Sequence, residues 1–229
     1  MFRRLVPFTA LCAGLLLSGA ASALSLSDLS QSDASGGLKD ALAQGAQVAV
    51  KQLGTPGGFN NNPQVRIQLP AKLEKANKLL GALGMGSQVQ ELENGMNSAA
   101  EAAVPQAQAI LVNAVKSMTV SDAKGILSGG NDSATEYLNK TSREEIRAKF
   151  LPIVKANTDK IGLAQRFNSV AGQAGSVAGL NAKTNTVEGY VTEKALDGLF
   201  KMIAQQEETI RKNPAAAATS LAKKVFGSI

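Results

Sequence analysis

Residues 87–118, SQVQELENGMNSAAEAAVPQAQAILVNAVKSM, carry the longest amphipathic pattern in the chain. Apolar side chains recur there every three or four positions, as on one face of an α-helix. A helix over these residues would be roughly 48 Å long. Pro105 lies inside the pattern and predicts a kink or a split, because proline lacks the backbone donor that a helix interior needs. The apolar stripe keeps its phase across Pro105, and this favours a kink. The stripe comprises Val89, Leu92, Met96, Ala100, Ala103, Ala107, Ile110, Leu111, Ala114 and Met118.

Helical patterns also cover most of the chain on either side of this stretch. Before it, apolar spacing predicts helices over residues 38–53 and 71–83. After it, caps and apolar spacing predict five helices. One ends near Leu127, one begins at Asp132 or Ser133, one begins at Ser142, one runs from Thr192 to Lys212, and one ends at Gly227. The sequence therefore predicts an all-α fold.

One short segment departs from the helical pattern. Residues 54–63, GTPGGFNNNP, are dense in glycine, proline and asparagine and predict a loop. After this loop Val65, Ile67 and Leu69 alternate with polar residues, as in a strand. We expect a single irregular multi-helix domain over residues 36–229, with at most one short strand-like segment near residues 64–69.

The first 23 residues have the three parts of a secretory signal peptide. Arg3 and Arg4 form the positive region, residues 5–17 the apolar core, and residues 21–23 an A-x-A cleavage site. We expect cleavage after Ala23, export to the periplasm, and a mobile lead-in or a short helix over residues 24–35. The apolar core is too short to span a bilayer. We therefore predict no transmembrane helix in the mature chain.

The mature chain is expected to lack both histidine and cysteine. The protein has no histidine, and its one cysteine, Cys12, lies in the predicted signal peptide. This composition excludes imidazole and thiolate catalysis, disulfides, and typical zinc or copper sites. A carboxylate site for magnesium or calcium stays open, although we predict no metal ligand and no cofactor.

The charge of the mature chain is mildly positive. Loss of the signal peptide lowers the formal net charge from +6 to +4, because it removes two arginines and no acidic residue. The basic residues are scattered among acidic ones. We therefore predict no nucleic-acid partner.

Glu207 and Arg211 form the first candidate site. At 100° per residue, Glu207 falls inside the apolar face of the predicted helix from Thr192 to Lys212, and Arg211 lies one turn further on. A carboxylate that points at a core needs a charged or hydrogen-bonding partner. We favour an i,i+4 ion pair at the rim of the core. The alternative is a polar network in a cleft that is open to a ligand.

Three further candidates lie earlier in the chain. Asn97 and Glu101, together with Glu93, are spaced four apart along one border of the long apolar stripe. Such a row can line a groove or hold a hard cation, but it is more often the solvated shoulder of a helix. Asp122, or Ser121 beside it, is expected to cap the helix that ends near Leu127. Asp122 also belongs to the carboxylates that a hydrolytic site could use.

Several short motifs occur together along the mature chain, and they resemble those of the bacterial domain-of-unknown-function 4197 family. The motifs are GLKDAL (37–42), QLP (68–70), MNSAAEAA (96–103), VKSMTVSDAKGIL (115–127), GGNDSATEYL (129–138), PIV (152–154), YVTEKALDGLF (190–200), ETIRKNP (208–214) and KKVFG (223–227). The resemblance implies an exported helical protein with no assigned activity. It supplies no catalytic residues.

These observations support two hypotheses about function. The first is a non-catalytic protein of the periplasm that binds an unknown protein or small-molecule partner, or that supports the envelope. The second is a carboxylate-dependent envelope hydrolase with a site near Glu207 and Arg211, which would require Glu101 and Asp122 to converge on the same cleft.

Overall fold

A computed structural model describes residues 30–70, 86–165 and 186–228, and it confirms the all-α fold class. Within these ranges the chain forms seven α-helices and two 3-10 helices, and no strand. The predicted signal peptide and the predicted helix over residues 71–83 lie outside the described residues. The helices are α1 (Gln31–Leu53), α3 (Gly86–Ala103), η2 (Val104–Gln106), α4 (Ala107–Ser117), α5 (Val120–Leu127), α6 (Ser133–Lys160), α8 (Val187–Lys212), η3 (Pro214–Ala216) and α9 (Ser220–Phe226).

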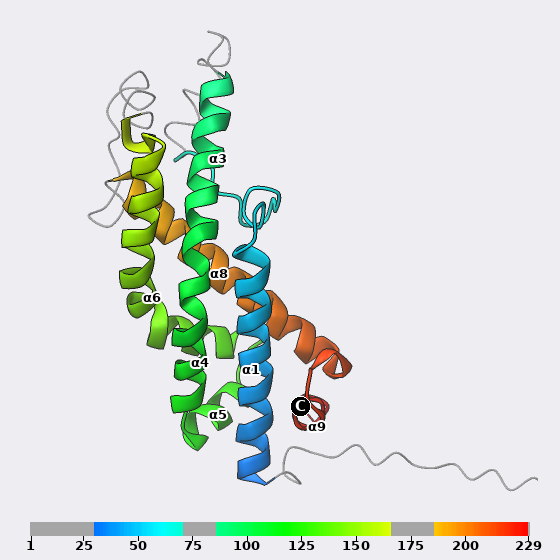
Figure 1. Ribbon diagram of the computed structural model, residues 1–229. Coiled ribbons are helices and arrows are strands. Elements are labelled where there is room, and N and C mark those ends of the chain that lie inside the picture. The colour runs from blue at the N-terminus through cyan, green and yellow to red at the C-terminus, as the bar shows by residue number, and fades with distance from the viewer. Residues whose placement is uncertain (1–29, 71–85, 166–185, 229) are drawn as a thin grey trace, which may run out of the picture.

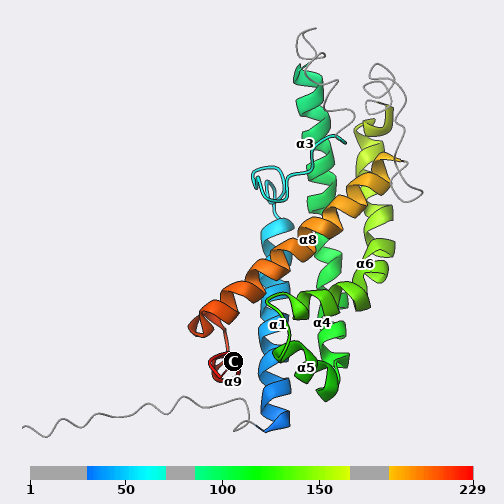
Figure 2. The same ribbon diagram turned by 180° about the vertical axis from the view of Figure 1, so that it is seen from behind.

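Helix α8 crosses the other long helices diagonally. Figure 1 shows α1 beside the column formed by α3 and α4, with α6 on the far side of that column. Seen from behind in Figure 2, α8 runs across α1, α3 and α6 and packs against all three. The short helices α5 and α9 lie at the lower end, against α1. The buried face of α8 therefore organises the core.

The long apolar pattern forms two helices rather than one kinked helix. Pro105 lies in the 3-10 turn η2, which separates α3 from α4. The two helices still lie nearly end to end, as Figure 1 shows, so the apolar stripe continues across the turn. All ten residues of the predicted stripe are buried or pack against the core.

Three predicted helix boundaries differ from the structure. Helix α1 begins at Gln31 and is capped by Ser30, earlier than the helix predicted over residues 38–53. Ser142 begins no helix, because it lies inside α6 and its hydroxyl donates to the Leu138 carbonyl. Thr192 is also an interior residue, since α8 is capped by Thr186. The Ser142 hydroxyl is satisfied within its own helix, whereas the Thr192 hydroxyl is buried without a hydrogen-bond partner. The sequence alone does not separate such interior residues from caps.

The strand-like segment has no strand partner among the described residues. We call residues 59–69 the strap. It has no regular secondary structure after residue 65, and it lies between α3 and α8. The predicted alternation is present, since Val65, Ile67 and Leu69 are buried. Side chains of α3 take the place that a neighbouring strand would occupy.

Candidate functional site

A row of three side chains on α3 binds the backbone of the strap. The row consists of Glu93, Asn97 and Glu101, which share one line along the helix because they are spaced four apart. Oε1 of Glu101 accepts hydrogen bonds from the backbone N–H groups of Phe59 (3.0 Å) and Asn60 (3.1 Å). Oε1 of Glu93 accepts from Leu69 at 3.4 Å, and its Oε2 pairs with Arg66 at 3.2 Å.

Asn97 imitates a strand at the centre of this row. Its Oδ1 accepts from the backbone N–H of Ile67, and its Nδ2 donates to the carbonyl of the same residue, both at 2.8 Å. Nδ2 also donates to the Glu93 carbonyl at 2.7 Å. Two bonds to one residue are the pattern of a hydrogen-bonded pair in an antiparallel sheet. Asn97 is fully buried, so its candidate ligand position is occupied by the protein's own chain.

Helix α8 holds the strap from the other side. The Tyr190 hydroxyl donates to the Gln68 carbonyl at 2.8 Å, and the Lys201 ammonium donates to the Gln64 carbonyl at 2.9 Å. Gly198 leaves room for the ring of Phe59, because a Cβ at this position would lie 2.7 Å from Phe59 Cε1. Phe59 is fully buried. It therefore packs into the core rather than offering a contact surface.

Glu207 caps helix α6 from α8. The side chain is buried, with 4% of the residue exposed. Oε1 accepts from the backbone N–H of Ala134 at 3.1 Å, and Oε2 accepts from the N–H and hydroxyl of Thr135 at 2.9 and 2.8 Å. The N-cap residue, Asp132, makes no side-chain capping bond. The Glu207 carboxylate replaces that cap and faces the positive end of the helix dipole.

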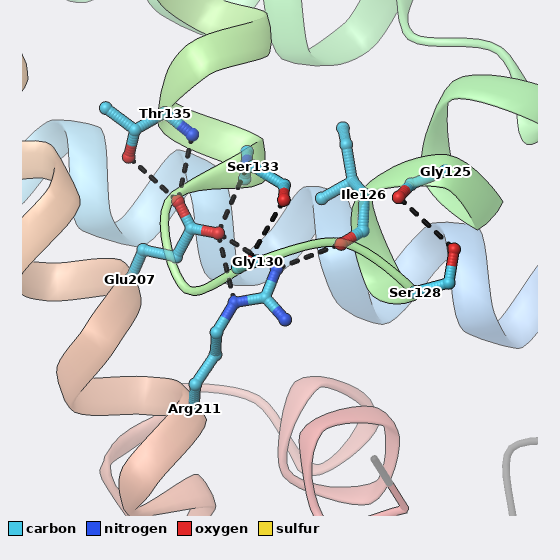
Figure 3. A network of polar contacts seen from close by, with 9 residues as sticks. Gly125, Ile126, Ser128, Gly130, Ser133, Thr135, Glu207 and Arg211 are labelled. Carbon is cyan, nitrogen blue, oxygen red and sulfur yellow. Dashed lines mark hydrogen bonds and ion pairs between the residues drawn. The ribbon is translucent and has the colours of Figure 1, made fainter.

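Arg211 completes this cluster, which Figure 3 shows. Its Nε and Nη2 donate to Glu207 Oε1 at 3.0 and 2.9 Å, so the pair forms the i,i+4 ion pair that we favoured. Nη2 also donates to the Ile126 carbonyl at 3.0 Å, and the guanidinium lies 5.7 Å from the centre of the Phe226 ring. This Glu207 clamp joins α8 to α5, α6 and α9.

The space next to Glu207 is small. A cavity of about 10 Å³ adjoins the carboxylate, which is room for about one water molecule. Its other lining residues are apolar or glycine: Ala41, Leu42, Gly45, Ile203, Ile210 and Phe226. The geometry therefore fits the ion-pair interpretation better than a ligand cleft.

Asp122 belongs to a capping box rather than to a shared cleft. The N-cap of α5 is Thr119, whose backbone N–H and hydroxyl donate to Asp122 Oδ2 at 2.8 and 2.7 Å. These two bonds, the backbone one first, lower the pKa of the Asp122 carboxyl. Glu101, Asp122 and Glu207 form their hydrogen bonds with different groups in different elements. The candidate carboxylates thus form three separate clusters.

The sequence did not single out a fourth polar cluster, between α6 and α8. Nη2 of Arg143 pairs with Glu193 at 2.9 Å and with Asp197 at 2.8 Å, while Nε of Arg147 pairs with Glu193 at 2.6 Å. Burial acts to raise the pKa of Glu193, but the hydrogen bonds from both arginines outweigh it and the pKa is lowered. Arg143 and Arg147 are spaced four apart on α6, and so are Glu193 and Asp197 on α8. The sequence does not show, however, that these two helices pack together.

A shallow depression lies beside this cluster on α6. It is open to solvent, measures about 380 Å³, and is lined by Glu136, Asn139, Lys140, Arg143 and Glu144. One of its members, Asn139, has a buried Oδ1 without a hydrogen bond. All five residues come from one helix, so the depression offers a polar surface and not an enclosed site.

Two other features are absent from the described residues, namely a metal site and a membrane-spanning helix. No set of three or more acidic side chains is placed to hold a metal ion in this part of the chain. Helices long and apolar enough to cross a membrane are likewise not found there.

Comparison with protein families gives one match over nearly the whole chain. The model for a protein of unknown function, DUF4197, matches residues 28–227. No curated protein and no solved structure matches this chain.

Proposed function

We propose that this chain, which belongs to the DUF4197 family, is an exported, non-catalytic helical protein that binds a partner protein in the bacterial envelope. One observation supports this function above the others. The buried polar side chains that could have formed a reaction centre hold the protein's own backbone instead: Asn97, Glu101 and Glu207.

A catalytic carboxylate must reach the substrate, either directly or through one water. Glu101 and Glu207 are both buried, and each accepts two backbone N–H bonds. Glu207 caps a helix and Glu101 binds a turn, so both carboxylates are engaged with the protein's own backbone. This geometry favours a binding role over hydrolysis.

The proposed export rests on the sequence of the first 23 residues, where a positive region, an apolar core and an A-x-A site follow one another. On this proposal the protein acts through its surface. In the described part of that surface, the large apolar side chains that are most exposed are Val120 (42%) and Ile161 (44%). They give two natural probe positions at different ends of the structure.

Site-specific photo-crosslinking in living cells tests this function. A photoreactive phenylalanine analogue would replace Val120 or Ile161, and the exposed Lys212 would serve as the control position. We expect a discrete crosslinked species, larger than the monomer, from one of the two apolar positions and not from Lys212. Recovery of the monomer alone from every position would contradict the proposal.

The hydrolase alternative gives a different result. An envelope hydrolysis that the purified mature protein catalyses, and that Glu207→Gln abolishes while the circular dichroism spectrum is unchanged, would replace the binding function. We expect no such loss, because Glu207 faces the first turn of α6 rather than solvent.

A further inference from the structure

The strap is attached to the rest of the protein in an unusual way. Within the described residues, the backbone–backbone hydrogen bonds of residues 58–66 are local turns, such as Asn61 to Gly57 and Arg66 to Asn62. From residue 67 to 69 the backbone is bound by side chains: Asn97 and Glu93 on α3, and Tyr190 on α8. No backbone ladder ties the strap to a helix in this part of the chain.

Such an attachment separates the strap from the helices energetically. Opening a helix breaks its own ladder of bonds, whereas opening the strap breaks only the side-chain bonds and the packing of its apolar residues. Segments of this kind open at lower free energy than the surrounding core, as cooperative units. The turn before the strap contains Gly57 at φ +84°, a conformation that glycine adopts without strain.

The packing shows what an open strap would uncover. Phe59 and Val65 both contact the place on α8 where Gly198 lacks a side chain. Ile67 lies under Asn97 of α3 and is buried. When these three side chains leave, an apolar groove is exposed between α3 and α8.

We propose that the strap opens and closes as one unit, with Asn97 as its latch, and that opening exposes the apolar groove between α3 and α8. In the closed state the strap itself occupies this groove. The opening does not depend on the proposed function and is tested separately.

Hydrogen exchange of the full-length mature protein, followed by mass spectrometry, tests the latch. In the wild type we expect residues 59–69 to exchange well before residues 195–203, the buried middle of α8. Asn97→Ala removes three hydrogen bonds of the closed state, so it should accelerate exchange of the strap by at least roughly tenfold, and the strap should still exchange before residues 195–203. Ser98→Ala, at the exposed neighbouring position on α3, is the control and should change neither segment.

A milder variant covers the case in which Asn97→Ala does not fold. Tyr190→Phe removes the bond from its hydroxyl to the Gln68 carbonyl and should accelerate exchange of the strap by a smaller factor. The proposal is overturned if the strap and the middle of α8 exchange together in the wild type. It is equally overturned if Asn97→Ala or Tyr190→Phe folds and leaves exchange of the strap at the wild-type rate. Neither result depends on whether a partner protein is found by crosslinking.

Discussion

At the scale of single residues, three buried polar side chains bind backbone groups that lie far away in the sequence: Asn97, Glu101 and Glu207. Glu207 binds the first turn of α6, 72 and 73 positions earlier, and Asn97 binds Ile67, 30 positions earlier. A buried acceptor of this kind is costly to remove, because its former donors stay buried without partners. These residues therefore stabilise the fold in proportion to the groups that they satisfy.

Removing Glu207 should have a large effect on stability. Glu207→Ala leaves the buried Arg211 guanidinium without its carboxylate partner, and it leaves the N–H groups of Ala134 and Thr135 without their acceptor. We expect urea denaturation to show a loss of about 3–5 kcal/mol in the free energy of unfolding.

The neighbouring Glu208 provides the matched control. It forms an exposed i,i+4 pair with Lys212, and Glu208→Ala should change stability by at most about 0.5 kcal/mol. Equal effects of the two substitutions would show that the Glu207 clamp does not hold α6.

The sequence predicted part of the residue-scale picture. Helical geometry placed Glu207 inside an apolar face and Arg211 one turn away, so the ion pair was predictable. The backbone donors at Ala134 and Thr135 were not, because nothing in a local pattern says which helix end will meet α8. For the same reason the row of Glu93, Asn97 and Glu101 looked like a solvated shoulder, whereas it binds the strap.

At the scale of elements, α8 depends on a close approach and on ion pairs. Gly198 admits the ring of Phe59, and the pairs of Arg143 and Arg147 with Glu193 join α8 to α6. Small residues and charged borders together let one helix contact α1, α3, α6 and the strap.

A methyl group at Gly198 should push the strap away. Gly198→Ala places Cβ 2.7 Å from Phe59 Cε1, and we expect a loss of about 1–3 kcal/mol by denaturant unfolding. Gly125→Ala in α5 is the control, since a Cβ there meets nothing within 4 Å, and it should stabilise the protein by about 0.5–1 kcal/mol. If Gly198→Ala were also stabilising, the close packing of Phe59 on α8 would be wrong.

The Glu193 cluster should make stability depend on pH. Because the pKa of Glu193 is lowered in the fold, its contribution is present above the ordinary value of 4.5 and is lost as the pH falls through the lowered pKa. Glu193→Gln removes this titration. In melting curves between about pH 7 and pH 3, the wild type should have a higher melting temperature than the variant at pH 7. The gap between the two melting temperatures should narrow below the ordinary pKa. A gap that widens on acidification would have the opposite sign and would contradict the assignment.

At the scale of the whole molecule, helical periodicity was sufficient for the fold class and insufficient for the arrangement. Amphipathic stripes predicted most of the described helices, since each must bury one face. The alternation at residues 64–69 predicted the buried side chains of the strap, but alternation does not specify whether the neighbour is a strand or a row of helix side chains. The crossing of α8 over three other helices depends on contacts between segments that are far apart in the sequence. No local pattern contains these contacts.

Export is also a property of the whole molecule. We expect the mature protein from the native host to begin at Leu24 and to be released with the periplasmic fraction. Intact-mass spectrometry of that fraction measures the cleavage site directly. A full-length product that stays in the cytosol would contradict the export on which the proposed envelope function depends.

The account as a whole claims that the buried polar residues serve the fold rather than a reaction. Denaturant unfolding of Glu101→Ala, compared with Ser98→Ala on the same helix, tests this claim most directly. Because Glu101 satisfies the N–H groups of Phe59 and Asn60, we predict a loss of about 2–4 kcal/mol for Glu101→Ala and almost none for Ser98→Ala. Unchanged or increased stability of Glu101→Ala, as expected of a residue kept for a ligand or a reaction at the expense of the fold, would contradict it.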